Sequence, residues 1–90
     1  MTDTLDIQRK RLLFRSKHRG TKEADLLFGA FAERHLAEFD RDQLDAYEKL
    51  IAAEDPDLWD WVIALTPAPL EFDTPILKLL RNFRYTVPFS

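Results

Sequence analysis

The side chains best suited to chemistry gather in one basic segment near the start of the chain, residues 9–23, with the sequence RKRLLFRSKHRGTKE. Arg11, Arg15 and His18 recur at the spacing of one helical face, and Arg19 follows where that helix would end. Guanidinium groups bind carboxylates and phosphates through a rigid fork of N–H donors. No nucleophile, base and orienting group can be assembled from the sequence, so the segment indicates binding rather than catalysis.

Three interpretations of this basic segment stay open from residue types alone. It fits a solvated helix face with extended basic side chains, a surface for RNA or phosphate, or a docking patch for an acidic protein surface. Nucleic-acid binding needs exposed aromatic residues among the basic ones, and the only aromatic residue here is Phe14, which we expect in the core. The net charge of −3 also counts against a nucleic-acid partner.

The composition excludes several kinds of site. The 90 residues include no cysteine, which rules out Cys-based zinc sites, cysteine nucleophiles and redox pairs. Two glycines cannot form a Gly-rich phosphate loop, and two histidines are too few for a His-built metal centre. Residues 1–22 carry seven basic and two acidic side chains, whereas residues 23–73 carry three basic and fourteen acidic ones. We therefore expect a polarised binding protein with no catalytic, metal or cofactor site.

Helices must position these side chains, because β-branched residues are sparse and no stretch alternates with period two. Ninety residues suffice for one domain, so we expect an all-α, compact five-helix bundle over residues 1–90. The first few residues and residues 86–90 are expected to form loose tails. The expected helices are Leu5–His18, Lys22–Phe39, a third that begins at Asp40 or Asp42 and carries Leu44 to Ile51, Pro56–Leu65, and a fifth that opens at Thr74-Pro75.

Local signals predict how several residues serve these helices. Gly20 ends the first helix and Thr21 caps the second. His35 lies on an apolar stripe and is expected to pack in the core, while Trp59 and Trp61 cannot share one helical face. One tryptophan is therefore expected in the core and the other at a rim. The residues expected to be buried are Leu27, Phe28, Phe31, Tyr47, Leu50, Ile51, Leu58 and Val62.

Two short motifs give the chain a family resemblance. Arg19-Gly20-Thr21-Lys22-Glu23 reads RGxxE, and residues 55–61 read DPDL followed by two residues and Trp61. With both motifs in register and a basic helix before them, the sequence resembles the SdhE family, the bacterial counterparts of mitochondrial succinate dehydrogenase assembly factor two. The resemblance covers nearly the whole chain.

The resemblance implies a five-helix bundle and an assembly factor that promotes covalent FAD attachment to the flavoprotein subunit of succinate dehydrogenase, and often of fumarate reductase. The factor is not the catalyst in this family, because the flavoprotein's own histidine reacts with the flavin. The resemblance thus implies that FAD belongs to the client, and this chain shows no dinucleotide fingerprint of its own. The runner-up interpretation is a nucleic-acid-binding or antitoxin-type regulator that uses the basic helix.

The resemblance places Arg19, Gly20 and Glu23 at the partner interface, and the helical-face argument adds Arg11, Arg15 and His18 to it. Arg19 and Glu23 lie on no apolar stripe, so replacing either should cost at most about 1 kcal/mol of stability. We expect a monomer that binds no nucleic acid and does not insert into membranes. The N-terminus has no apolar signal region, so we expect a protein that stays in the compartment where it is made. Together with the resemblance to a bacterial family, this implies a bacterial cytoplasmic protein.

Overall fold

The computed structural model describes residues 4–53 and 55–84, and every regular element within them is helical. The predicted all-α class with five helices is confirmed, whereas the predicted tails fall largely on residues 1–3 and 85–90, outside the described ranges. The α-helices are α1 (Thr4–Lys17), α2 (Lys22–His35), α3 (Arg41–Ile51), α4 (Asp55–Val62) and α5 (Pro75–Arg84), with the 3₁₀ turns η1 (Leu36–Glu38) and η2 (Leu70–Phe72) before α3 and α5.

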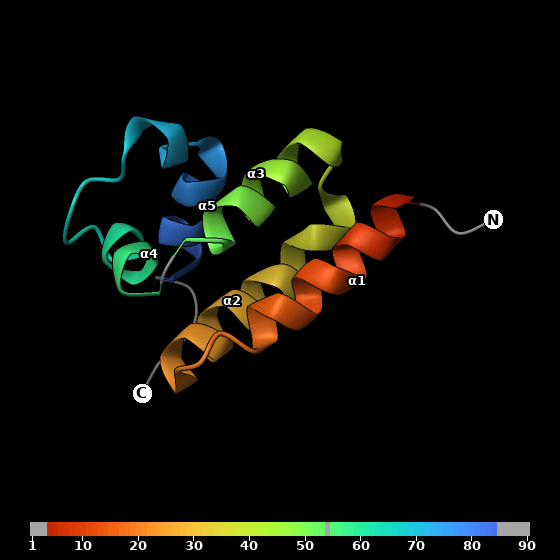
Figure 1. Ribbon diagram of the computed structural model, residues 1–90, viewed down its shortest axis with the longest axis horizontal. Helices are drawn as coiled ribbons and strands as arrows, with labels where there is room; N and C mark the ends of the chain where they lie inside the picture. Colours follow the sequence, from red (N-terminus) through yellow and green to blue (C-terminus); the bar gives the residue numbers. More distant parts are fainter. Residues whose placement is uncertain (1–3, 54, 85–90) are drawn as a thin grey trace.

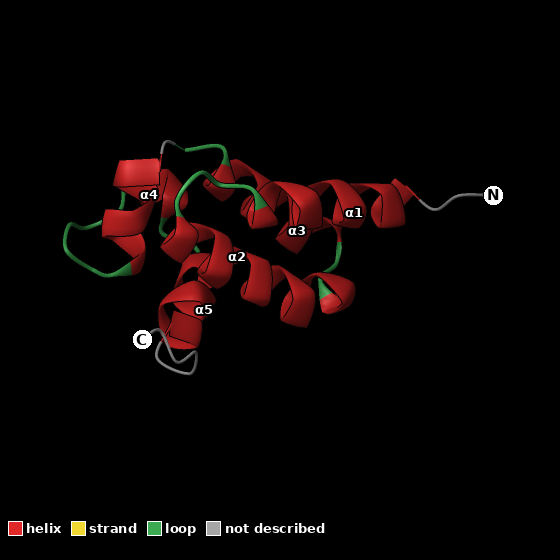
Figure 2. Cartoon of the chain, turned by 90° about the horizontal axis from the view of Figure 1, so that it is seen from below, coloured by secondary structure: helices red, strands yellow, loops and turns green. Residues whose placement is uncertain are grey.

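The helices form a long antiparallel pair with three shorter helices packed against it. Figure 1 shows α1 and α2 side by side, with α3 along the same body and α4 at one end. From below, α5 runs across α2 (Figure 2), and it also packs against α3 and α4. Gly29 lets the long pair approach closely, because a Cβ atom there would lie 3.2 Å from Cγ of Lys17.

The inner face of α1 is unusual because two of its three buried residues are polar. Gln8, Leu12 and Ser16 lie one helical turn apart and are all buried. The Ser16 hydroxyl donates to the Leu12 carbonyl at 2.7 Å, so the Tyr47 hydroxyl donates to Ser16 across 2.6 Å. Burial raises the pKa of Tyr47, which stays a neutral donor inside the core.

The core contains every residue expected to be buried, including Leu27, Phe31 and Tyr47. The expectation that Phe14 is a core residue is wrong, because its side chain is 65% exposed. The buried stripe of α1 passes through Leu12, and a position two residues further points to the opposite side of a helix. An aromatic ring therefore lies exposed among the basic residues of α1.

His35 packs within a cluster of aromatic side chains. Its ring centroid lies 4.7 Å from that of Phe31, 5.9 Å from that of Phe39 and 5.8 Å from that of Phe83. Desolvation, followed by the charge of Arg34, lowers the pKa of His35 below its usual value. The His35 side chain is half-buried, so the prediction that it lies in the core is confirmed only in part.

The second helix ends earlier than predicted, at His35 rather than Phe39. The chain tightens there into η1, and the Arg9 guanidinium donates to the Leu36 and Phe39 carbonyls, both at 2.9 Å. The next helix starts with a capping box between Asp40 and Gln43, which identifies the N-cap among the two predicted aspartates. Thr21 caps α2 as predicted, since its hydroxyl accepts from the backbone N–H of Ala24.

Helix α4 ends at Val62 instead of the predicted Leu65. The Leu65 N–H donates to the Asp60 carbonyl at 2.8 Å and the Ala64 N–H to the Trp61 carbonyl at 3.2 Å, which together make a Schellman motif. Ala64 holds the left-handed position of this motif with φ of 61°. The predicted stop at Thr66-Pro67 therefore lies beyond the real helix end.

Sequence patterning did not predict η2, which folds the α4–α5 connection back onto the core. The Phe72 ring stacks on Trp61 with 4.9 Å between centroids. The Arg81 guanidinium also binds here, donating to the Trp61 carbonyl at 2.8 Å. Trp61 is 8% exposed and is therefore the core tryptophan of the predicted pair.

Ala64→Gly should stabilise the protein. A left-handed backbone costs alanine roughly 0.5–1 kcal/mol relative to glycine, and Ala64 is exposed, so the change removes no packed side chain. Urea unfolding should give a free energy of unfolding higher by about that amount. Ala37→Gly is the matched control, because Ala37 is also exposed but has negative φ, and glycine should destabilise there. Equal effects at both positions would contradict the explanation.

Candidate functional site

The turn between α1 and α2 lies against the junction of α3 and α4. The Arg19 guanidinium donates to the Ile51 carbonyl and, at 3.2 Å, to the Ala53 carbonyl. Its central carbon lies 5.5 Å from the centroid of the Phe28 ring. The segments that contain the two sequence motifs, residues 19–23 and 55–61, therefore meet at one corner of the molecule, which we call the motif corner.

The backbone of the turn is held by a side chain that sequence reasoning missed. The Asp25 carboxylate accepts from the backbone N–H of Arg19 and, at 3.1 Å, from that of Gly20. Gly20 has φ of 121°, a conformation that side chains disfavour, so the predicted positive φ at this glycine is confirmed. The prediction that Gly20 itself ends the first helix is wrong, because α1 ends at Lys17. The signal for Asp25 is an acidic residue in the first helical turn after a glycine, a position from which a carboxylate reaches free N–H groups.

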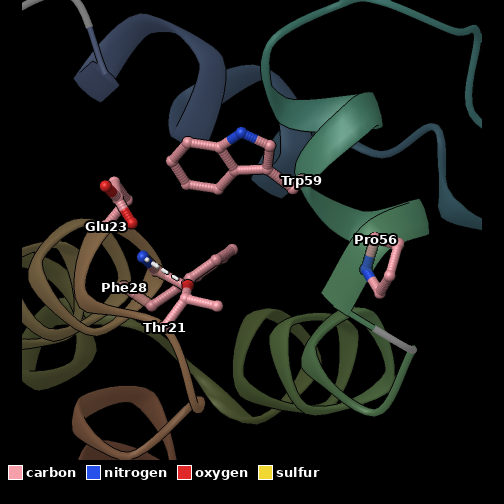
Figure 3. Close-up of a pocket in the computed structure, with 6 residues that line it drawn as sticks. Thr21, Glu23, Phe28, Pro56 and Trp59 are labelled. Atoms are coloured by element: carbon pink, nitrogen blue, oxygen red, sulfur yellow. Dashed lines mark hydrogen bonds between the residues drawn. The ribbon is translucent and has the colours of Figure 1, made fainter.

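An apolar hollow of about 460 Å³, which we call the Trp59 slot, lies on one side of this turn. Figure 3 shows Trp59 on α4 across the slot from Glu23 and Phe28 on α2. Phe28 is buried, Trp59 is half-buried and Glu23 is exposed, and the Glu23 carboxylate makes no hydrogen bond or ion pair with any described residue. Trp59 is thus the rim tryptophan that the sequence predicted. The lining residues are Thr21, Glu23, Ala24, Phe28, Pro56 and Trp59.

A more open hollow of about 640 Å³, the Phe14 groove, lies on the other side of the turn. The exposed Phe14 ring stacks on His18 with 4.4 Å between centroids, and Arg15 lies beside them. Pro56 lines both hollows, so the Phe14 groove and the Trp59 slot adjoin. Residues 51–53 at the end of α3 complete the wall of the groove.

The motif corner gathers most of the side chains expected to bind a partner. Arg15, His18 and Arg19 line the Phe14 groove and Glu23 lines the Trp59 slot, with Gly20 in the turn between them. The expectation that Arg19 contributes little to stability is at odds with the structure, because its guanidinium is bound to the end of α3.

Arg11 lies apart from the corner, over α3. Its guanidinium pairs with the Glu48 carboxylate at 2.9 Å, and the Gln8 amide donates to the same oxygen at 3.1 Å. Desolvation raises the pKa of Glu48, but the hydrogen bonds from Gln8 and Arg11 outweigh it and hold the pKa below its usual value. The helical face that the sequence defined is therefore divided between an internal ion pair and the motif corner.

Metal ligation and membrane spanning are two further properties that the described residues could provide. Within residues 4–53 and 55–84, no group of three or more His, Asp or Glu side chains is placed to hold a metal ion. No helix in those same ranges is long and apolar enough to cross a membrane.

Comparison with known proteins supplies the family. The family model described as flavinator of succinate dehydrogenase matches residues 10–84, which include both motifs of the corner. The chain belongs to this family. The resemblance inferred from the two motifs is thereby confirmed, and no comparison supports the nucleic-acid or antitoxin alternative.

Curated relatives agree with the family assignment. The chain is 39% identical over 82 residues to "Succinate dehydrogenase assembly factor 2-B, mitochondrial" of Drosophila ananassae, covering 89% of this chain and 50% of the relative. It is 40% identical over 74 residues to "Succinate dehydrogenase assembly factor 2, mitochondrial" of Dictyostelium discoideum, covering 82% of this chain and 52% of the relative. The chain thus spans about half the length of these relatives.

Arg19→Ala should lower the free energy of unfolding by about 1–3 kcal/mol, because it leaves two carbonyls at the end of α3 without their donors. Arg19→Lys should recover only part of the loss, since a single ammonium cannot reproduce the guanidinium fork. Urea unfolding measures both effects.

Arg15→Ala is the matched control for this measurement. Arg15 is of the same residue type in the same corner, but its guanidinium makes no hydrogen bond or ion pair with the described residues. Its replacement should change stability by less than about 0.5 kcal/mol. Equal losses for Arg15→Ala and Arg19→Ala would contradict the structural role of Arg19.

Proposed function

We propose that this protein promotes the covalent attachment of FAD to the flavoprotein subunit of succinate dehydrogenase. It binds that subunit through the motif corner and stabilises a conformation competent for flavinylation. The observation that carries the proposal is the family match over residues 10–84, which includes the two segments that meet at the corner. The proposal includes the flavoprotein subunit of fumarate reductase as a second client.

The mechanism requires only differential binding. A factor that binds one conformation of its client more tightly than the others raises the population of that conformation, within the limit set by the difference in affinity. The client's own histidine would react with the flavin, and the factor itself is not an enzyme. FAD remains the client's group, and the factor holds none tightly.

The rigidity of the motif corner suits this task. Arg19 ties the turn to the end of α3, and Asp25 holds its backbone N–H groups, so little conformational freedom remains to be lost on binding. Glu23 and His18 are exposed and Arg15 is partly exposed around this fixed backbone. They give a partner charges of both signs at adjoining hollows.

The proposal also covers the oligomeric state of the protein and its location in the cell. We propose that it acts as a monomer in the cytoplasm of a bacterium, although the relatives named above are mitochondrial. Sedimentation of the purified protein tests whether it is a monomer, and cell fractionation tests whether it lies in the cytoplasm.

Nucleic-acid binding is the alternative function, and we treat it as an outcome that would contradict our proposal. The exposure of Phe14 beside Arg15 and His18 removes one argument against it, because an exposed aromatic ring beside a basic side chain is what base stacking needs. Salt-dependent binding to single-stranded RNA at physiological ionic strength would contradict our proposal, and no such binding is expected.

Arg15→Glu should reduce covalent flavin on the client severalfold without unfolding the factor. Arg15 lines the Phe14 groove and makes no hydrogen bond or ion pair with described residues, so charge reversal breaks no such contact, although it also places a carboxylate near Asp45 and Glu48. The measurement is in-gel flavin fluorescence of the flavoprotein subunit in cells that lack their own factor, with equal levels of each variant.

Lys78→Glu is the control for charge reversal, because Lys78 is exposed on α5 and lines neither hollow of the motif corner. It should support flavinylation as well as the wild-type protein does. If the wild-type protein itself does not raise covalent flavin in these cells, the proposed function is wrong.

A further inference from the structure

The Trp59 slot combines an apolar interior with a carboxylate that has no bond to the described residues. Phe28 is buried within it, the half-buried Trp59 indole forms the opposite wall, and Glu23 lies at the rim (Figure 3). Glu23 lies in the first turn of α2, where the helix dipole favours an acidic residue. Asp25 in the same turn is engaged with the backbone, which leaves Glu23 as the acidic side chain that this turn offers to a partner.

An aromatic wall opposite a carboxylate suits an alkyl cation. Tryptophan binds cations through the negative face of its ring better than the other aromatic side chains do, and a carboxylate neutralises the charge. The same chemistry already occurs at this site within the chain, since the Arg19 guanidinium lies 5.5 Å from the Phe28 ring centroid. The carbonyls at the end of α3 offset part of the charge of Arg19, so it opposes a second cation less than an unbound guanidinium would.

Other occupants fit the slot less well. An acidic side chain would be repelled by Glu23. A purely apolar side chain would exclude water from the Glu23 carboxylate without giving it a partner, which carries a desolvation cost. Five of the six lining residues also belong to the segment 23–73, which carries three basic and fourteen acidic side chains. Charge complementarity therefore favours a cation.

We propose that the Trp59 slot receives one basic side chain, arginine or lysine, from the protein that this factor binds. The aliphatic stem lies against Trp59 and Phe28, and the cationic head pairs with Glu23. The inference rests on the proposed function for the identity of that protein, the flavoprotein subunit. The chemistry of the slot can be tested without it.

The first experiment uses small probes. The Trp59 indole N–H signal, assigned by its loss in Trp59→Phe, is followed by NMR during titration with n-butylguanidinium or n-butylammonium. Neutral n-butylurea has the same shape as the guanidinium probe without its charge. Both cations should shift the signal at concentrations several times lower than the urea does, and Glu23→Gln should abolish this preference. Equal shifts by charged and neutral probes would overturn the inference.

The second experiment uses the flavoprotein subunit without bound FAD. Glu23→Gln keeps the size of the side chain and should weaken binding on the order of tenfold, the effect expected for one cation pair at an aromatic wall. Trp59→Leu should weaken it similarly. The weakening by Glu23→Gln should shrink as salt is raised from 50 to 300 mM, which the loss of a merely structural contact would not do.

Asp42→Asn is the matched control, because Asp42 is also an exposed acid in the first turn of a helix but lies outside the slot. It should bind the subunit like the wild type. Wild-type affinity in Glu23→Gln would overturn the inference while leaving the proposed function intact. Failure of the wild-type protein to bind the subunit, with the probe preference present, would instead overturn the proposed function and the identity of the partner.

Discussion

A helix that ends inside a small domain leaves its last carbonyl groups short of hydrogen-bond donors, and here arginine side chains from other parts of the chain donate to carbonyls at such ends. The carbonyls of Leu36 and Trp61 also accept from backbone N–H groups. Arg9 of α1 binds the carbonyls around η1, Arg19 binds those at the end of α3, and Arg81 of α5 binds that of Trp61 in α4. Each contact joins elements that are distant in sequence. The relative placement of the helices, and with it the motif corner, depends on these three cations.

These contacts show that much of the basic N-terminal segment serves the fold and is not a free cationic surface. Composition alone suggests a continuous cationic surface, yet Arg9, Arg11 and Lys17 are bound to other parts of the chain, as is Arg19. The charges that remain at the motif corner are few and of mixed sign, with Arg15 in the Phe14 groove, Glu23 at the Trp59 slot and the exposed Lys22 beside Glu23. A few fixed charges beside apolar hollows suit recognition of one protein surface better than attraction of any polyanion.

Sequence reasoning predicted the features that depend on local signals. The helices, the caps at Thr21 and Asp40, and the core of α2 and α3 follow from periodicity and capping residues within a few positions. It failed for Phe14 because α1 buries Gln8 and Ser16, so the hydrophobic pattern does not mark the inner face. It proposed Arg19 as a partner-binding residue but could not show its carbonyl acceptors, which lie more than thirty residues away. The two motifs are likewise brought together only by the tertiary structure, which local sequence signals do not reveal.

The link from Arg19 to the end of α3 also bears on the order of events during folding. The two bonded residues are separated by 32 positions in one case and 34 in the other, so neither contact forms until α3 has docked on the α1–α2 pair. Closing loops of this length costs chain entropy that local helix contacts do not, and such contacts form late. The motif corner is therefore completed among the last parts of the molecule. A chain that has folded only its long helical pair offers no finished motif corner, so under the proposed function only factors that have reached the native state would recognise a client.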